Sequence, residues 1–295
     1  MSASGLTAPG FHSKGMRRRR VVNFVMELLA WGAAAIAVGV LAVVVFAVAR
    51  RGWSALNTDL LTKPPIPFST APQGLANAFA GTIVIVGIAT LMALPIGILV
   101  AVYVNEFAPA SIRNGVTMVL DILNGIPAIV IGIFVYGLLV VGSGQSGFKG
   151  AFALAILMLP FVARSTMEVL ALVPNSLREA SLGLGIPHWR TTLSIVLPQT
   201  IGGIVTGTVL AVARVAGETA PLLFTSSLVG NQTSWNPTQP LQTVPVAIFE
   251  LSESPDPADH ARAWAAAFIL LMFILVTSLT ARWLANRSRS KIAGR

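Results

Sequence analysis

The sequence predicts an all-α polytopic membrane protein with about six transmembrane helices. Three observations lead to this fold class: 55% of the 295 residues are hydrophobic, only 11% are charged, and the mean hydropathy is +0.78. Soluble globular proteins carry about 25% charged residues, so a soluble core cannot hide this much apolar surface. The chain has no cysteine, which excludes a disulfide framework, a thiolate metal site and a cysteine nucleophile.

Six apolar stretches are long enough to cross a bilayer, which takes about 20 mostly apolar residues per helix. They are residues 23–48, 76–104, 115–141, 147–169, 197–224 and 261–284. The first follows the basic cluster Arg17 to Arg20 and is too long for a cleaved signal peptide, so it is expected to remain as a membrane helix. In the third, Gly125 and Pro127 predict a kink.

Lys and Arg residues favour the cytoplasmic side of a membrane. They gather on one side of the predicted spans, so both termini are expected in the cytoplasm. This interpretation gives a cytoplasmic N-terminal tail (1–20), a transmembrane domain (21–285, with its core at 76–285) and a cytoplasmic C-terminal tail (286–295). Residues 51–75 and 225–260 are expected to form extracytoplasmic loops. Because the cations flank apolar spans, the net charge of +9 does not indicate a nucleic-acid partner.

A polar stretch, residues 173–198, separates the fourth span from the fifth and is expected on the cytoplasmic side. Ser176 and Glu179 form a capping-box pattern that predicts the start of a short helix. Gly185 suits its end, and Pro187 prevents its continuation. Leu177, Ala180 and Leu184 would share one face. Periodicity alone leaves two alternatives open: the helix docks on a partner protein, or it lies on the lipid surface.

Two predicted spans carry an arginine followed by a glutamate four residues later, which places both side chains on one helical face. The pairs are Arg164 with Glu168 and Arg214 with Glu218. They could be neutralised pairs that hold helices together. Alternatively, the arginines could be binding positions for an anion, because a guanidinium binds two oxygens of an oxyanion at once. Asp121 could pair with an arginine or lie near the cytoplasmic end of its span.

Two groups of motifs carry a resemblance to a known family. Glu179, Ala180 and Gly185 stand at the spacing of the loop motif Glu-Ala-Ala-x-x-x-Gly, with Ser181 as its one departure, and 195–198 complete its distal half. This motif resembles that of importer-type ABC permeases. Residues 211–225, together with 124–130, 159–168 and 173–180, resemble the permease subunits of ATP-driven phosphate importers. The resemblance covers most of the chain from about residue 76 onward.

The resemblance implies a type I ABC importer permease fold in the plasma membrane of a bacterium, with this chain as half of a phosphate pore. It implies three kinds of protein partner besides lipid and phosphate: a homologous second permease, two ATP-binding subunits, and an extracytoplasmic phosphate-binding protein. The chain has no Gly-x-x-x-x-Gly-Lys-Ser/Thr loop, so ATP and Mg are expected on the ATP-binding subunits, with no cofactor and no catalysis on this chain. His188 and His260 lack partners at metal-ligand spacing, so no metal site is expected.

The family also implies roles for particular residues. Residues matching Arg164 and Arg214 are implicated in phosphate passage, and Glu218 and Glu168 are expected beside them. The family's carboxylate three residues after the first arginine is Met167 here, and Glu168 is a candidate to replace it. The residues expected to couple to the ATPase are Arg178, Glu179, Ala180 and Gly185.

Two alternatives to phosphate import follow from the sequence. A sulfate or molybdate permease would share the cytoplasmic loop motif, but the run Ala-Gly-Glu-Thr-Ala-Pro at 216–221 favours phosphate. A secondary anion transporter would show inverted repeats within one chain and would not need the loop motif.

Overall fold

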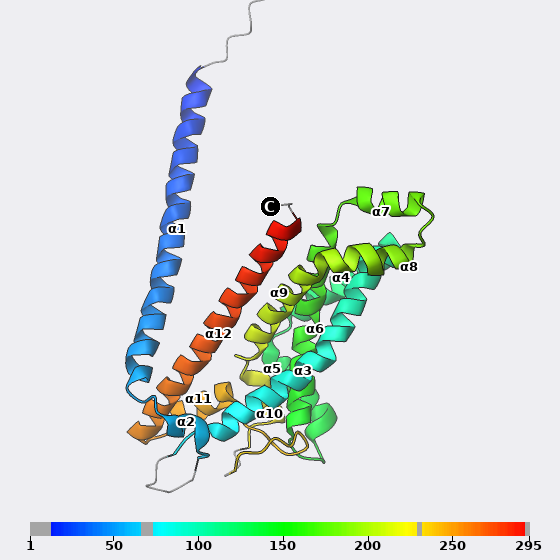
Figure 1. Ribbon diagram of the computed structural model, residues 1–295. Helices are drawn as coiled ribbons and strands as arrows, with labels where there is room; N and C mark the ends of the chain where they lie inside the picture. Colours follow the sequence, from blue (N-terminus) through cyan, green and yellow to red (C-terminus); the bar gives the residue numbers. More distant parts are fainter. Residues whose placement is uncertain (1–12, 66–72, 229–231, 293–295) are drawn as a thin grey trace, which may run out of the picture. The chain divides into compact units, whose positions relative to one another are not determined.

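The computed structural model describes residues 13–65, 73–228 and 232–292, and every regular element in these ranges is a helix (Figure 1). Five helices are long and apolar enough to cross a membrane, and a bent pair makes a sixth span. The prediction of an all-α protein with about six spans is therefore confirmed. The chain divides into two units, residues 1–50 and 51–295.

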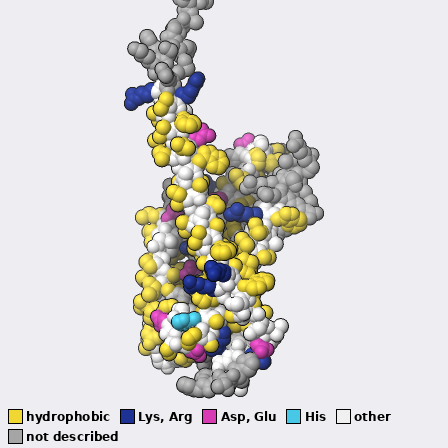
Figure 2. Space-filling model, turned by 90° about the vertical axis from the view of Figure 1, so that its left-hand side faces the viewer, with side chains coloured by type: hydrophobic (Ala, Val, Ile, Leu, Met, Phe, Trp, Pro, Cys, Tyr) yellow, Lys and Arg dark blue, Asp and Glu magenta, His cyan; other side chains and the backbone are white. Residues whose placement is uncertain are grey.

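The first unit consists of most of α1 (Ser13–Trp53). From Val21 to Val44 its large apolar side chains are exposed, as Figure 2 shows along the helix. A helix without an apolar partner in its own unit is suited to lipid. Because α1 begins at Ser13, residues 13–20 of the predicted N-terminal tail are helical, and residues 1–12 lie outside the described ranges.

The second unit is a helix bundle built on α3 (Ala76–Val102), α6 (Gly147–Ala171), α9 (Leu197–Val215) and α12 (Pro257–Ile292). Its main core contains Ile85, Leu154 and Met158, all fully buried. Glycines bring the helices close: a Cβ on Gly97 of α3 would lie 2.9 Å from Val162 of α6. Small residues allow the two backbones to approach closely. Such close packing is needed because apolar side chains gain little by associating with one another in lipid.

The third predicted span is broken rather than kinked. It consists of α4 (Ala110–Gly125) and α5 (Ala128–Val135), which continues as a π-helical turn (Tyr136–Val140), and the two halves meet at 94°. Pro127 caps α5 and forces an extended conformation on Ile126, with φ −70° and ψ 128°. The sequence located the bend correctly but underestimated it.

The fifth span begins and ends earlier than predicted. It runs from His188 to Val215 through α8 (His188–Thr191), a π-helical turn (Thr192–Val196) and α9. The π-helical turn accommodates Pro198, which lacks an N–H group, at the start of α9. The chain then leaves the helix and forms the separate α10 (Ala220–Thr225). A single helix over 197–224 was therefore wrong.

Short helices also occur where the sequence predicted loops or tails. They are α2 (Thr58–Thr62) and α11 (Val244–Ser252), and α12 continues through residues 286–292 of the predicted C-terminal tail. Within the second unit, α7 (Asn175–Gly183) and α8 lie at the same end as the C-terminal part of α12 (Figure 1). The helices α2, α10 and α11 lie at the opposite end.

Candidate functional site

Arg164 is placed by α6, whose position against α9 is fixed by two close glycine contacts. A Cβ on Gly207 would lie 2.5 Å from Ser165 Oγ, and one on Gly203 would lie 2.5 Å from Val169 Cγ1. Arg164 therefore projects from a helix that has little freedom to rotate. Its guanidinium donates a hydrogen bond to, and forms an ion pair with, the Asp121 carboxylate of α4. Of the two alternatives predicted for Asp121, the structure shows pairing with an arginine.

Arg214 reaches the same side of α6. Its guanidinium carbon lies 4.3 Å from the centre of the Phe161 ring. Phe161 precedes Arg164 by three residues, about one turn of α6. Arg164 projects from α6 itself, whereas Arg214 comes from α9 and lies over Phe161 about one turn away. The two guanidinium groups therefore make a short series of cationic positions along α6.

Glu218 does not share a helical face with Arg214. The helix α9 ends at Val215, and Glu218 follows it in a turn, where its N–H donates to the Val215 carbonyl at 3.1 Å. The prediction of a four-residue step on one helix was therefore wrong for this pair. The Ala216-Gly217 turn and the need to begin α10 near Pro221 explain the break.

Glu168 does lie one turn after Arg164 on the continuous helix α6, but its side chain is exposed, and Arg164 pairs with Asp121 instead. Met167, at the position of the family's carboxylate, packs against buried Leu170 and its neighbours. On α6, the side chain of Glu168 therefore lies outside the apolar core, whereas that of Met167 packs against it.

The predicted coupling helix exists as α7. It begins at Asn175, and its N-cap residue is Pro174, which makes no side-chain hydrogen bond to the helix. The expected capping box of Ser176 and Glu179 therefore does not form. At its C-terminus, Gly185 has φ +76°, and two N–H groups, of Gly185 and Ile186, donate to the carbonyls of Leu182 and Ser181. This is a Schellman ending, which needs a residue in the left-handed conformation and so favours glycine.

Large apolar side chains of this segment face away from the bundle. Leu184 is 81% exposed, and Leu177, Leu182 and Trp189 are also exposed, as are Glu179 and Ala180. A single exposed leucine needs no explanation, but four large apolar side chains exposed on α7, its C-cap and α8 offer a surface for contact with a partner.

Arg178 differs from its neighbours because it turns inward. Its guanidinium donates to both carboxylate oxygens of Glu106, at 3.1 and 2.7 Å, and also to the carbonyls of Val173 and Leu170. The side chain of Glu106 is 2% exposed and that of Arg178 is 15% exposed. The pair therefore fixes α7 against the end of the α3 span.

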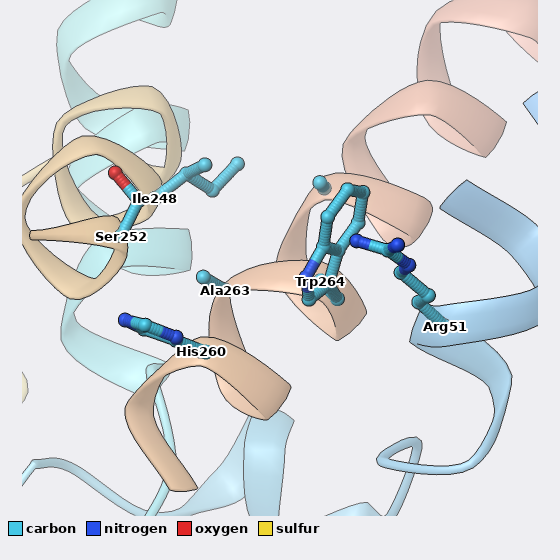
Figure 3. Close-up of a pocket in the computed structure, with 7 residues that line it drawn as sticks. Arg51, Ile248, Ser252, His260, Ala263 and Trp264 are labelled. Carbon is cyan, nitrogen blue, oxygen red and sulfur yellow. The ribbon is translucent and has the colours of Figure 1, made fainter. Parts of the chain in front are cut away.

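A pocket of about 410 Å³ lies at the opposite end of the second unit, between α11 and the start of α12 (Figure 3). Its lining residues are Arg51, Ile248, Ser252, His260, Ala263, Trp264 and Ala267. The Arg51 guanidinium carbon lies 4.8 Å from the Trp264 ring centre, and His260 Nε2 is 2.7 Å from the Ser254 carbonyl oxygen. None of the sequence-predicted site residues lines this pocket. Within the described ranges, no group of three His, Asp or Glu side chains is arranged to hold a metal ion.

Three features characterise this fold: the 94° bend between α4 and α5, the close α6–α9 contact and the protruding helix α7. The chain belongs to the family of binding-protein-dependent transport system inner membrane components, which it matches over residues 93–290. Individual relatives point to one kind of permease within this family. The chain is 42% identical to the phosphate transport system permease protein PstA of Haemophilus influenzae, over 81% of this chain and 85% of the relative. It is 36% identical to PstA 1 of Mycobacterium tuberculosis strain H37Rv, over 92% and 91%.

Solved structures show the same fold. The inward-facing MetNI methionine ABC transporter matches with a TM-score of 0.56 and 17% identity, over 72% of this chain and 93% of that one. A bacterial alginate ABC transporter in complex with an alginate-bound periplasmic protein matches with a TM-score of 0.56 and 16% identity, over 94% and 98%. The fold is thus that of type I ABC importer permeases, as the sequence predicted.

The structure also identifies residues that the sequence did not select for the site. Asp121 and Phe161 contact the two arginines, and Glu106 holds α7. Lone carboxylates within or at the end of apolar spans were the available signal for Asp121 and Glu106. No sequence pattern distinguishes Phe161 from the other apolar residues of α6.

Proposed function

We propose that this chain is the membrane permease subunit of an ATP-driven importer of inorganic phosphate and forms half of the translocation pore. The observation that carries the proposal is its identity of 36 to 42% to relatives named phosphate transport permeases, over at least 81% of the chain. The sulfate or molybdate alternative has no comparable support.

The path for the anion is assigned to the face of α6 that bears Arg164, with Arg214 beside it. Guanidinium groups suit phosphate because their fork of donors matches its oxygens. Glu168 and Glu218 are assigned to the rim of the same path. Negative groups near such cations prevent the anion from binding too tightly to leave, which transport requires.

The segment 173–198 is assigned to coupling. The exposed apolar residues of α7 would fill a groove on an ATP-binding subunit, which supplies ATP, Mg and hydrolysis. Two such subunits would bind, one to this chain and one to a homologous second permease. Exposed apolar side chains on α4 and α5, among them Met118, Ile122 and Phe134, offer a surface for that permease or for lipid.

The opposite end of the bundle is assigned to the outside of a bacterial plasma membrane, where an extracytoplasmic phosphate-binding protein would deliver its ligand. Both termini would then be cytoplasmic. ATP binding would draw the coupling helices together and open the pore outward. Hydrolysis would return it to the inward-facing state and release phosphate past Arg164.

Reconstitution with all three kinds of protein partner tests the proposal. ATP-dependent uptake of radioactive phosphate, with sulfate as the competing anion, is the measurement. We expect uptake that requires the ATP-binding subunits and is not reduced by excess sulfate. Uptake that persists without those subunits would refute an ATP-driven importer, and equal uptake of sulfate would refute the assignment of the cargo.

The variant Arg214→Leu tests the path separately. It should abolish uptake while the complex still assembles, because Arg214 contacts an aromatic ring and has no ion-pair partner among the described residues. The control Arg282→Leu removes an exposed arginine near the end of α12 and should transport normally. If Arg214→Leu instead prevents assembly, Arg214 holds helices together.

A further inference from the structure

We propose that Asp121 is an internal counter-anion of the phosphate path: its carboxylate neutralises Arg164 when phosphate is absent and gives way when phosphate arrives. The inference rests on the proposed function and adds a residue to it that competes with the cargo. The observation that carries it is the ion pair between Asp121 of α4 and Arg164 of α6.

Among the described residues, the two ion pairs that join different helices have different surroundings. Glu106 and Arg178 are 2% and 15% exposed, and Arg178 also donates to two backbone carbonyls. Asp121 and Arg164 are 52% and 34% exposed. Within the described residues, the contact with Asp121 is the one hydrogen bond that Arg164 makes, although a guanidinium has five N–H donors. The Glu106–Arg178 pair is therefore buried and held by several hydrogen bonds. In the Asp121–Arg164 pair, the guanidinium keeps N–H donors available to solvent or a ligand.

A displaceable counter-ion must be chemically similar to the cargo and weakly held. A carboxylate and a phosphate are both oxyanions that bind a guanidinium through two oxygens. Where a half-exposed ion pair lines a water-filled path, it is weak, because water solvates both partners once they separate. Asp121 therefore neutralises Arg164 without binding it too firmly for phosphate to replace.

The position of Asp121 also gives it a way to move. It lies in the last turns of α4, just before the 94° break at Ile126 and Pro127. Backbone breaks between rigid helices are where hinge rotations occur. A small rotation of α4 at this break would withdraw the carboxylate from Arg164, while α6 remains fixed by its glycine contacts with α9.

Product inhibition distinguishes this role from a purely structural one. If Asp121 helps to displace phosphate from Arg164, its neutralisation should slow release and make uptake more sensitive to phosphate on the release side. In the fully reconstituted transporter, we expect Asp121→Asn to lower the phosphate concentration for half-inhibition by about fivefold, a coupling at the low end of the usual range. The maximal rate should fall as well.

Two further variants complete the test. Asp121→Glu keeps the charge and should stay near the wild-type half-inhibition. Glu27→Gln neutralises an exposed carboxylate of α1 and should behave as wild type. If Asp121→Asn does not assemble, Asp121→Ser replaces it, with the same expectation.

An unchanged half-inhibition in an assembled neutral variant would overturn the inference, as would failure of both neutral variants to assemble, since Asp121 would then be structural. These outcomes differ from failure of the proposed function. In that case the wild-type complex itself would show no ATP-dependent uptake of phosphate.

Discussion

Arg178 of α7 binds both carboxylate oxygens of Glu106 at the end of the α3 span, at 3.1 and 2.7 Å. The contact joins a nine-residue helix, which would be marginal alone, to a long membrane helix. A force applied to α7 by a docked subunit would therefore reach α3 through this pair. Arg178, which is expected to couple to the ATPase, is positioned to do so by holding α7.

Removing one member of this pair should cost more than removing both. Arg178→Met leaves the Glu106 carboxylate buried without an ion-pair partner, with only the hydrogen bond from Asn105 Nδ2 at 3.0 Å. Removing one partner of a buried ion pair typically destabilises a protein by about 3–5 kcal/mol. Adding Glu106→Leu removes that uncompensated charge, so the double variant should recover part of the loss. Thermal unfolding of the four proteins of this double-mutant cycle in detergent measures the coupling. Strictly additive losses would contradict an interacting buried pair.

The exposed face of α7 should matter for coupling and not for stability. Leu184→Asp places a charge where the side chain is 81% exposed, so the free energy of unfolding should change by no more than about 0.5 kcal/mol. In the reconstituted complex, however, transport-linked ATP hydrolysis should fall at least tenfold, because the charge would have to be buried on docking.

Leu61→Asp is the matched control, since Leu61 of α2 is also an exposed leucine but lies at the other end of the bundle. It should leave ATP hydrolysis intact. Equal effects of the two variants would show that the face of α7 has no special part in coupling.

The sequence predicted what depends on local pattern. Long apolar runs located the membrane helices, and Gly185 and Pro187 located the end of α7, because a left-handed residue and a missing N–H act within a few positions. The spacing of Arg164 and Glu168 was read correctly on the uninterrupted helix α6.

It could not predict what depends on neighbours distant in the chain. Arg214 and Glu218 have the same spacing as Arg164 and Glu168, yet α9 ends between them, although the apolar run continues into α10. Likewise, Asp121 and Arg164 are 43 residues apart, and their pairing depends on how α4 folds back on α6. The roles of these side chains in transport stay predictions until tested.

The close contact between α6 and α9 predicts sensitivity to a single methyl group. In Gly207→Ala the new Cβ would lie 2.5 Å from Ser165 Oγ and 2.8 Å from Ser165 Cβ, so the helices must separate. Overpacking of this kind costs about 1–3 kcal/mol. Because Ser165 is next to Arg164, transport should fall too. Thermal unfolding and uptake measure the two effects.

Gly115→Ala of α4 is the control, because a Cβ there meets nothing within 4 Å. Alanine favours a helix over glycine by about 1 kcal/mol, so this variant should be as stable as the wild type or more so. A Gly207→Ala protein that matched it would show that α6 and α9 are not held at close range.

Glu250 of α11 predicts a pH dependence of stability. Burial raises the pKa of its carboxyl above the ordinary value of 4.5, and a hydrogen bond from Gln242 Nε2 at 2.6 Å offsets this only in part. The folded protein therefore holds this proton more tightly than the unfolded chain does. The stability contributed by protonated Glu250 is complete below pH 4.5 and is lost as pH rises through the raised pKa.

Glu250→Gln should remove this loss, because a neutral amide can still accept the hydrogen bond from Gln242 and carries no charge to desolvate. At neutral pH the variant should unfold at a higher temperature than the wild type, and the difference should vanish below pH 4.5. Thermal unfolding from pH 4 to 8 measures both, with Glu253→Gln, an exposed carboxylate nearby, as the control. A variant less stable than the wild type at neutral pH would mean that ionised Glu250 stabilises α11, so the burial of its carboxyl would not be the dominant effect.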